Sequence, residues 1–289
     1  MDVGSVGIWS AELRYGDAGA VRDAAAELEA LGYSALWVPG GVGGAVFDDC
    51  KNVLDATTRV PVATGILNLW MHSIQETCDG HARVTAAYPD RFLLGIGVSH
   101  AALVDTNESG RYAKPLAATR TFLDEIDRTT PTVPADERVL GALGPKMLEL
   151  SRDRSAGAHP YLVPPEHTRF ARDVLGKGAL LAPEQHVVLE TDPEKARAVA
   201  RASLAIYMTL PNYVNNWRRC GFTDDDVSGA GSDRLVDAIV AWGDEATIAR
   251  RVQQHLDAGA DHVCVQIASE TRAEMPLDSW RRLAPALLG

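Results

Sequence analysis

The stretch that decides the fold is Arg91-Phe92-Leu93-Leu94-Gly95-Ile96-Gly97-Val98-Ser99-His100. Its apolar run is bounded by turn residues, which is typical of a strand that is buried on both faces. Such strands form parallel sheets, and α/β proteins bind their ligands at the carboxyl ends of these strands. The two glycines let a backbone or a flat ligand approach closely. We therefore expect the floor of a cofactor site here, with Ser99 and His100 at its mouth.

Length and composition limit the class of protein. A chain of 289 residues is normal for one α/β barrel, so we expect a single domain that spans residues 1–289. Its residues are 46% hydrophobic and 23% charged, as in a globular protein with a sizeable core. A net charge of −11 argues against binding to nucleic acid or to an anionic membrane, because both partners require a basic surface. The expected partner is a small-molecule substrate.

The location of the protein in the cell is predicted from what the sequence lacks. No apolar run is long enough to span a bilayer, and the first residues lack the basic start and apolar core of a signal peptide. The four cysteines are scattered without a Cys-x-x-Cys pair, which favours free buried thiols over a zinc site. We expect a cytoplasmic protein without a bound metal.

Strands and helices alternate along the whole chain, which favours a closed (β/α)₈ barrel over a Rossmann sheet. Extra helices between the seventh and eighth strands predict a helical insertion. Strands are predicted at residues 3–9, 34–38, 60–66, 91–97, 138–143, 157–163, 185–190 and 262–267. Helices are predicted at residues 17–31, 46–57, 73–87, 115–128, 144–153, 164–175, 192–210, 211–220, 232–242, 244–258 and 277–287.

In a barrel of this kind, functional side chains belong to the loops that follow the strands. His72, His100 and His159 each follow a predicted strand, although a single loop histidine is more often a satisfied surface residue. The turn Gly144-Pro145-Lys146 begins a helix, whose free N–H groups and dipole attract phosphate, although it also fits an ordinary turn. The long polar loop at residues 100–114 is expected to act at the mouth of the site.

Aromatic residues and the absence of common motifs indicate which kind of ligand site the sequence favours. Trp9 and Trp37 on strands are expected in the core, whereas Trp70 in a loop is the better candidate for a ligand wall. Gly95-Ile96-Gly97 lacks the third glycine of a dinucleotide fingerprint, and the glycine-rich loop at residues 39–44 lacks the Gly-Lys-Ser/Thr of a Walker loop. Few carboxylates follow the strands, which suits a large planar ligand better than a hydrolytic site.

Three stretches together resemble the bacterial luciferase-like superfamily, in particular its F420-dependent oxidoreductases. They are Val60-Pro-Val-Ala-Thr-Gly65-Ile66, Arg91-Phe-Leu-Leu-Gly-Ile-Gly97 and Gly144-Pro-Lys-Met-Leu-Glu-Leu-Ser. Three more stretches are similar to that branch: Gly95-Ile-Gly-Val-Ser-His100, Ala158-His-Pro-Tyr-Leu-Val163 and Leu181-Ala-Pro-Glu-Gln185. The resemblance extends over essentially the entire chain.

This resemblance implies a (β/α)₈ barrel, often dimeric, that holds coenzyme F420 or FMN at its carboxyl face. It also implies a bulge with a non-prolyl cis peptide at the end of the third strand, which here is Gly65-Ile66. A homodimer is therefore expected. The positions that match cofactor-lining residues of the family are Gly65, Ile66, Gly97, Val98, Ser99, Gly144, Pro145, Lys146, Met147 and His159.

The sequence departs from the family where protons are handled. Relatives often have a histidine after the second strand and a glutamate after the fourth, whereas this chain has Pro39-Gly40 and Ser99-His100. His100 is predicted to be the catalytic substitute, with His72 as the second candidate. Three hypotheses remain: an F420-dependent oxidoreductase that transfers a hydride to or from a small organic substrate, an FMN-dependent monooxygenase, and a non-catalytic cofactor-binding protein.

Overall fold

The computed structural model describes residues 1–105, 110–269 and 274–289, so part of the predicted loop at 100–114, residues 106–109, lies outside the described residues. The described chain forms a parallel sheet of ten strands in the order β7-β6-β5-β4-β3-β2-β1-β10-β8-β9. The strands are β1 (Val6–Trp9), β2 (Leu36–Gly40), β3 (Val62–Asn68), β4 (Phe92–Gly97), β5 (Arg138–Leu140), β6 (Gly157–Ala158), β7 (Leu180–Leu181), β8 (Glu184–Val188), β9 (Val240–Trp242) and β10 (Val263–Ile267).

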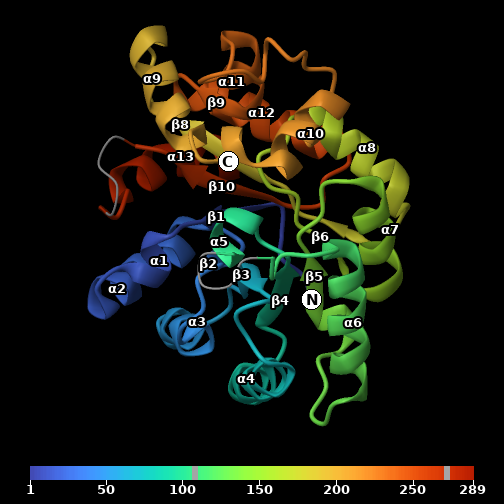
Figure 1. Ribbon diagram of the computed structural model, residues 1–289. Helices are drawn as coiled ribbons and strands as arrows, with labels where there is room; N and C mark the ends of the chain where they lie inside the picture. Colours follow the sequence, from blue (N-terminus) through green and yellow to red (C-terminus); the bar gives the residue numbers. More distant parts are fainter. Residues whose placement is uncertain (106–109, 270–273) are drawn as a thin grey trace.

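Helices surround the curled sheet (Figure 1). Several begin at side-chain caps: Asp17 accepts two backbone N–H bonds at the start of α2, and Ser73 and Glu76 form a capping box at α4. The helices are α1 (Glu12–Tyr15), α2 (Ala18–Leu31), α3 (Val46–Asp55), α4 (Ile74–Ala87), α5 (Ala101–Val104), α6 (Pro115–Arg128), α7 (Pro145–Arg154), α8 (Pro165–Leu175), α9 (Pro193–Leu204), α10 (Pro211–Arg219), α11 (Asp233–Ile239), α12 (Glu245–Asp257) and α13 (Leu277–Leu288), with 3-10 turns η1 (Ala135–Glu137) and η2 (Tyr207–Thr209).

One segment, residues 180–188, connects the two sides of the sheet. Its first part, β7, pairs with β6, and its second part, β8, pairs with β10. Between them the N–H of Ala182 donates to the carbonyl of Ala158 at 2.9 Å, and the N–H of Cys264 donates to the carbonyl of Pro183 at 3.0 Å. The sheet therefore curls, and because its strands are parallel, their carboxyl ends share one edge.

The side chains of the strands alternate between two cores. Trp37 and Cys264 belong to an apolar cluster inside the curl, whereas their neighbours Leu36 and Val265 pack in the cluster that the outer helices cover. This alternation follows from the two-residue period of a strand. Trp37 is fully buried, so its prediction as a core residue is confirmed.

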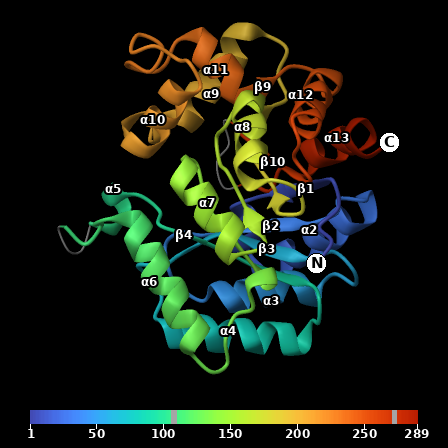
Figure 2. The ribbon, with the colours of Figure 1, turned by 90° about the vertical axis from the view of Figure 1, so that its right-hand side faces the viewer.

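Helices α9, α10 and α11 gather on one side of the molecule, next to β8 and β9 (Figures 1 and 2). They share their own apolar cluster, which includes Leu204, Trp217 and Leu235. The indole N–H of Trp217 donates to the carbonyl of Leu162 at 3.0 Å, which fixes α10 to the segment that follows β6. This contact brings the start of α10 to the edge of the sheet where the strands end.

The elements predicted at residues 232–242 and 157–163 differ clearly from the structure. Residues 240–242, predicted as the end of a helix, form β9, because Ala241 pairs with Val187 of β8 and lies in the core. The strand predicted at 157–163 ends at Ala158, since Leu162 has a left-handed φ of 53° and its N–H donates to the Glu184 carboxylate at 3.1 Å. Both differences depend on contacts with distant parts of the chain.

The end of β3 has the bulge that the resemblance implies. The register between β3 and β4 shifts between Ala63 and Leu67, and the Gly65–Ile66 peptide bond is cis. A Cβ on Gly95 would lie 1.9 Å from the Thr64 carbonyl oxygen, and one on Gly97 would lie 2.7 Å from Cδ1 of Ile66. The glycines of the fourth strand are therefore needed to admit the neighbouring strand and the Ile66 side chain.

Candidate functional site

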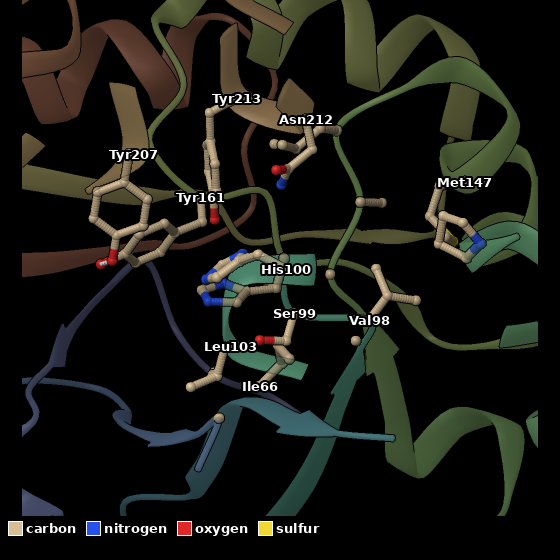
Figure 3. A pocket seen from close by; sticks show the side chains of 18 of the residues that line it. Ile66, Val98, Ser99, His100, Leu103, Met147, Tyr161, Tyr207, Asn212 and Tyr213 are labelled. Carbon is tan, nitrogen blue, oxygen red and sulfur yellow. Dashed lines mark hydrogen bonds between the residues drawn. The ribbon is translucent and has the colours of Figure 1, made fainter. Parts of the chain in front are cut away.

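A cavity of about 350 Å³ lies where the strands end, within the size range of small-molecule sites (Figure 3). The turns at Gly65, Gly97 and Gly144 all border it, as the sequence predicts. Its lining residues are mostly apolar, aromatic or glycine: Trp9, Pro39, Gly41, Gly65, Ile66, Gly97, Val98, Ser99, His100, Leu103, Tyr112, Pro115, Gly141, Ala142, Leu143, Gly144, Met147, His159, Tyr161, Tyr207, Asn212 and Tyr213.

The bulge at Gly65 and Ile66 is held in place from inside the curl. The indole N–H of Trp9 donates to the Gly65 carbonyl at 2.9 Å. A Cβ on Gly65 would lie 2.5 Å from the indole nitrogen and 2.9 Å from Nε2 of His159, so only glycine fits between these two rings. Trp9, predicted to be a core residue, is buried but also lines the cavity.

His100 stands at the end of β4, directly before α5, and lies near the centre of the cavity view in Figure 3. Its Nδ1 is buried and has no hydrogen-bond partner among the described residues. Burial lowers the pKa of the imidazole, so the ring is neutral at pH 7. The preceding Ser99 has a left-handed φ of 54°, an uncommon conformation that cavity-lining residues adopt more often than others. A neutral histidine with a free nitrogen can accept or return a proton here.

His159 is a second buried histidine on the cavity wall. Its Nδ1 bonds to the Ala182 carbonyl at 2.7 Å, which requires the proton on Nδ1 and leaves Nε2 as an acceptor. The ring stacks on Trp37 with centroids 4.4 Å apart, and burial lowers its pKa to about 4. Nε2 has no partner among the described residues, so this nitrogen could accept a hydrogen bond from a ligand.

Tyr161, Tyr207 and Tyr213 form one side of the cavity, which we call the tyrosine wall (Figure 3). The hydroxyl of Tyr207 donates to that of Tyr161 at 3.3 Å, and the hydroxyl of Tyr161 donates to Oε1 of Gln266 at 2.9 Å. Burial raises the pKa of Tyr161 and of Tyr213, with smaller contributions from neighbouring tyrosines and Glu184. Tyr161 and Tyr213 are therefore neutral at pH 7. Figure 3 places the wall across the cavity from Val98 and Met147.

The start of α7 is the part of the site suited to phosphate. Gly144 caps this helix and borders the cavity together with Met147, whereas Pro145 and Lys146 are not among the lining residues. The guanidinium of Arg219 lies 3.7 Å from the position that a Cβ on Gly144 would occupy. A helix N-terminus with an arginine beside it attracts an anionic group, which fits the phosphate of a flavin or deazaflavin.

Two other predicted residues lie away from the cavity. His72 is buried against Glu76, with Nδ1 and Oε1 3.1 Å apart, and is not among the lining residues. Trp70, predicted to be a ligand wall, is not among them either, and its indole N–H donates to the Val98 carbonyl at 2.9 Å. Trp70 thus braces the loop that holds Val98 and Ser99.

The sequence analysis missed several lining residues, above all Tyr207 and Asn212. Tyr207 lies in η2, between α9 and α10, and Asn212 lies in the first turn of α10; both are far along the chain from β3 and β4. No local pattern marks them, although the three tyrosines at positions 161, 207 and 213 are a large share of the seven in the chain. Their gathering could have been suspected only by assuming that the inserted helices cover the end of the sheet.

The glycine-rich loop after β2 has no titratable side chain on the cavity, to which it contributes Pro39 and Gly41. It is held by the buried Arg14, whose Nη1 donates to the Pro39 carbonyl at 2.7 Å and whose Nη2 donates to the Gly43 carbonyl. The Nε of Arg14 donates to Asp49 at 2.8 Å. In the part of the chain that is described, no cluster of three or more metal-binding side chains forms, and none of its helices is long and apolar enough to cross a membrane.

The fold and the cavity define a class: an α/β protein that has a cofactor-sized hollow at the carboxyl edge of a curled parallel sheet. The family model of luciferase-like monooxygenases matches residues 5–262, so the chain belongs to that family. No curated protein sequence matches it significantly.

Solved structures support the same fold at low sequence identity. The coenzyme F420-dependent tetrahydromethanopterin reductase from Methanopyrus kandleri is 15% identical, covers 99% of each chain and has a TM-score of 0.79. An F420-dependent secondary alcohol dehydrogenase is 13% identical, covers 100% of each chain and has a TM-score of 0.74. The FMN-bound oxygenating constituent of a diketocamphane monooxygenase from Pseudomonas putida is 10% identical over 98% of this chain and 96% of that one, with a TM-score of 0.68. At these identities, the similarity concerns the fold.

Proposed function

We propose that this protein is an F420-dependent oxidoreductase that transfers a hydride between the deazaflavin and a small organic substrate. The observation on which the proposal depends is the cavity, an apolar hollow bordered by the Ile66 bulge and by a neutral His100 with an unpartnered Nδ1. The two F420-dependent relatives, which cover at least 99% of both chains, support this choice.

The scaffold that we propose is a (β/α)₈ barrel with a helical insertion before its last strand. In support, residues 180–188 hydrogen-bond with β6 at their start and with β10 at their end, so that β7 and β8 act as one strand. Helices α9, α10 and α11 then form the insertion between this strand and β10.

The residues at the cavity fit the parts of the cofactor. Ile66, Val98 and Ser99 offer an apolar surface and backbone groups to a flat ring, and Nε2 of His159 offers an acceptor to a ring N–H. Gly144 and the start of α7 would hold the phosphate, with Arg219 beside them. Deazaflavin, when bound, supplies a two-electron hydride donor or acceptor.

Protons are handled by the chain itself. In alcohol oxidation, neutral His100 would accept the proton that the substrate hydroxyl loses, while bound oxidised deazaflavin would serve as the hydride acceptor. In carbonyl reduction, protonated His100 would donate a proton to the substrate oxygen, while bound reduced deazaflavin would serve as the hydride donor. Because burial lowers the pKa of His100, the neutral, proton-accepting form is populated at pH 7.

Titration of the purified protein with F420 and FMN, followed by fluorescence, tests the proposal. We expect F420 to bind at micromolar concentration and to be turned over with alcohols or enones. His100→Gln should lower kcat by roughly 10²–10⁴-fold, as expected for loss of a general base, with nearly unchanged F420 affinity. Binding of FMN alone would overturn the cofactor assignment, and an unchanged kcat would exclude His100 from the mechanism.

The second candidate is an FMN-dependent monooxygenase, which the FMN-bound relative with a TM-score of 0.68 favours. Oxygen consumption in the presence of reduced FMN, without turnover of F420, would support it. A non-catalytic cofactor-binding protein is the third candidate, because Pro39 and Gly41 supply no titratable group at the cavity. Tight cofactor binding without turnover across a panel of enones and alcohols would favour this third candidate.

A further inference from the structure

The cavity is lined without a single charged side chain: among the described residues, no Asp, Glu, Lys or Arg borders it. We propose that its substrate is an uncharged, largely apolar or aromatic carbonyl compound or alcohol, whose one oxygen meets Nδ1 of His100. This inference rests on the proposed function and specifies its substrate class. The tyrosine wall and the absence of a countercharge then select against carboxylates and ammonium groups.

The tyrosine wall presents rings to the cavity, because its hydroxyl groups are partly engaged elsewhere. The Tyr161 hydroxyl donates to Gln266 and accepts from Tyr207. The imidazole ring of His100 meets this surface edge-on. Its centroid lies 6.3 Å from that of the Tyr207 ring and 5.9 Å from that of the Tyr213 ring. Flat apolar molecules pack well against such rings, because edge-to-face and offset contacts between rings stabilise the complex.

The titratable groups that face the cavity are neutral at pH 7. Burial lowers the pKa of His100 and His159 and raises the pKa of Tyr112. Two charged groups lie near the cavity: Glu184 is already engaged by His186 and by the N–H of Leu162, and Arg219 lies beside Gly144, where the proposed function places the cofactor phosphate. A charged substrate would therefore lose its hydration without gaining an ion pair, which is costly.

Aromatic walls also bind organic cations, so the geometry of these rings matters. The centroids of Tyr161, Tyr207 and Tyr213 lie 5.0–6.4 Å from one another. At this spacing the rings pack against each other, and no room is left between them for a cation enclosed on several sides. The wall is therefore an apolar surface of rings inclined to one another by 47–79°, and not a cation cage.

Three para-substituted benzaldehydes of different charge test the inference: 4-formylbenzamide and 4-formylbenzoate, which have the same planar shape, and the bulkier 4-(trimethylammonio)benzaldehyde. Their binding to the F420-loaded protein is measured by calorimetry. We expect the neutral amide to bind about 30-fold more tightly than the carboxylate, which corresponds to about 2 kcal/mol. Equal affinities, or tighter binding of either charged compound, would overturn the inference.

Asn212 and Asn215 provide a matched pair of variants on helix α10. Asn212 lines the cavity, whereas Asn215 is exposed on the same helix. Asn212→Lys should place a cation at the wall and raise the affinity for 4-formylbenzoate at least tenfold, with Asn215→Lys as the control that leaves it unchanged. An unchanged affinity in Asn212→Lys, or an equal rise in both variants, would contradict the assignment of the binding surface.

The two proposals fail separately in this design. If neither F420 nor FMN binds, the proposed function is wrong, and the three aldehydes are compared on the chain alone. If F420 binds but the aldehydes do not discriminate by charge, the cofactor assignment stands and the substrate class is wrong.

Discussion

Replacing Gly97 by alanine tests whether the fourth strand needs glycine to admit Ile66. The new Cβ would lie 2.7 Å from Cδ1 and 2.8 Å from Cγ1 of Ile66, which is closer than carbon atoms tolerate. Overpacking of this kind costs about 1–3 kcal/mol. We therefore expect Gly97→Ala to lower the free energy of unfolding by about 2 kcal/mol and to displace Ile66, which weakens F420 binding.

A second substitution isolates the cause. Ile66→Ala removes Cγ1 and Cδ1 and leaves only Cβ, which is 3.5 Å from the new methyl group and thus in ordinary contact. The double variant should therefore be more stable than the sum of the two single changes predicts, with a coupling of about 1–2 kcal/mol. Gly141→Ala is the matched control, because its Cβ would meet Ile66 only at 3.5 Å.

Urea denaturation followed by tryptophan fluorescence measures these four variants, and F420 titration follows the site. The reasoning is refuted if Gly97→Ala is as stable as Gly141→Ala, or if the two changes at positions 66 and 97 are additive. Additivity would mean that the clash is relieved elsewhere, and the glycine would then have to be explained by direct contact with a ligand.

Three further predictions concern stability and the loop after β2. Arg14→Lys should cost about 2 kcal/mol, because lysine cannot reproduce the three-way contact of the buried guanidinium, and limited proteolysis should then cut the chain within residues 39–44. Glu29→Gln should lower the free energy of unfolding at pH 7, because backbone N–H donors hold the pKa of this carboxyl at about 2 instead of 4.5. This stabilisation is present above pH 4.5 and is lost as the pH falls toward 2. The urea denaturation curves of the wild type and the variant should therefore converge near pH 2. Buried neutral histidines should lower the free energy of unfolding as the pH falls from 6.5 toward 4, by about 1.4 kcal/mol per pH unit each in urea titrations. Burial lowers the pKa of His255 to about 3. It lowers the pKa of four other histidines to about 4: His81, His159, His167 and His262.

Local signals in the sequence were enough to predict most elements. Helices α2 and α4 lie within one residue of their predicted ranges, 17–31 and 73–87, because the caps at Asp17 and Ser73 depend on residues within one turn. The buried run of β4 was likewise recognisable from composition alone. These features need no knowledge of the remaining chain.

Features that depend on distant contacts were missed. The short strand at residues 240–242 exists because β8 pairs with it, and its sequence alone fits a helix end equally well. The tyrosine wall depends on α10, which the Trp217 contact with Leu162 holds over the sheet edge. His72 follows a strand as predicted, but its ring bonds within its own helix start and lies away from the cavity.

The glycines of the fourth strand show how one pattern can have two physical causes. The sequence left two explanations open for Gly95 and Gly97: the close approach of a backbone or that of a flat ligand. In the structure the absent Cβ atoms make room for Thr64 and Ile66 of the next strand, and Ile66 in turn borders the cavity. Gly97 also borders the cavity itself, so a change there should alter F420 binding both by moving the Ile66 side chain and by changing the cavity surface at Gly97.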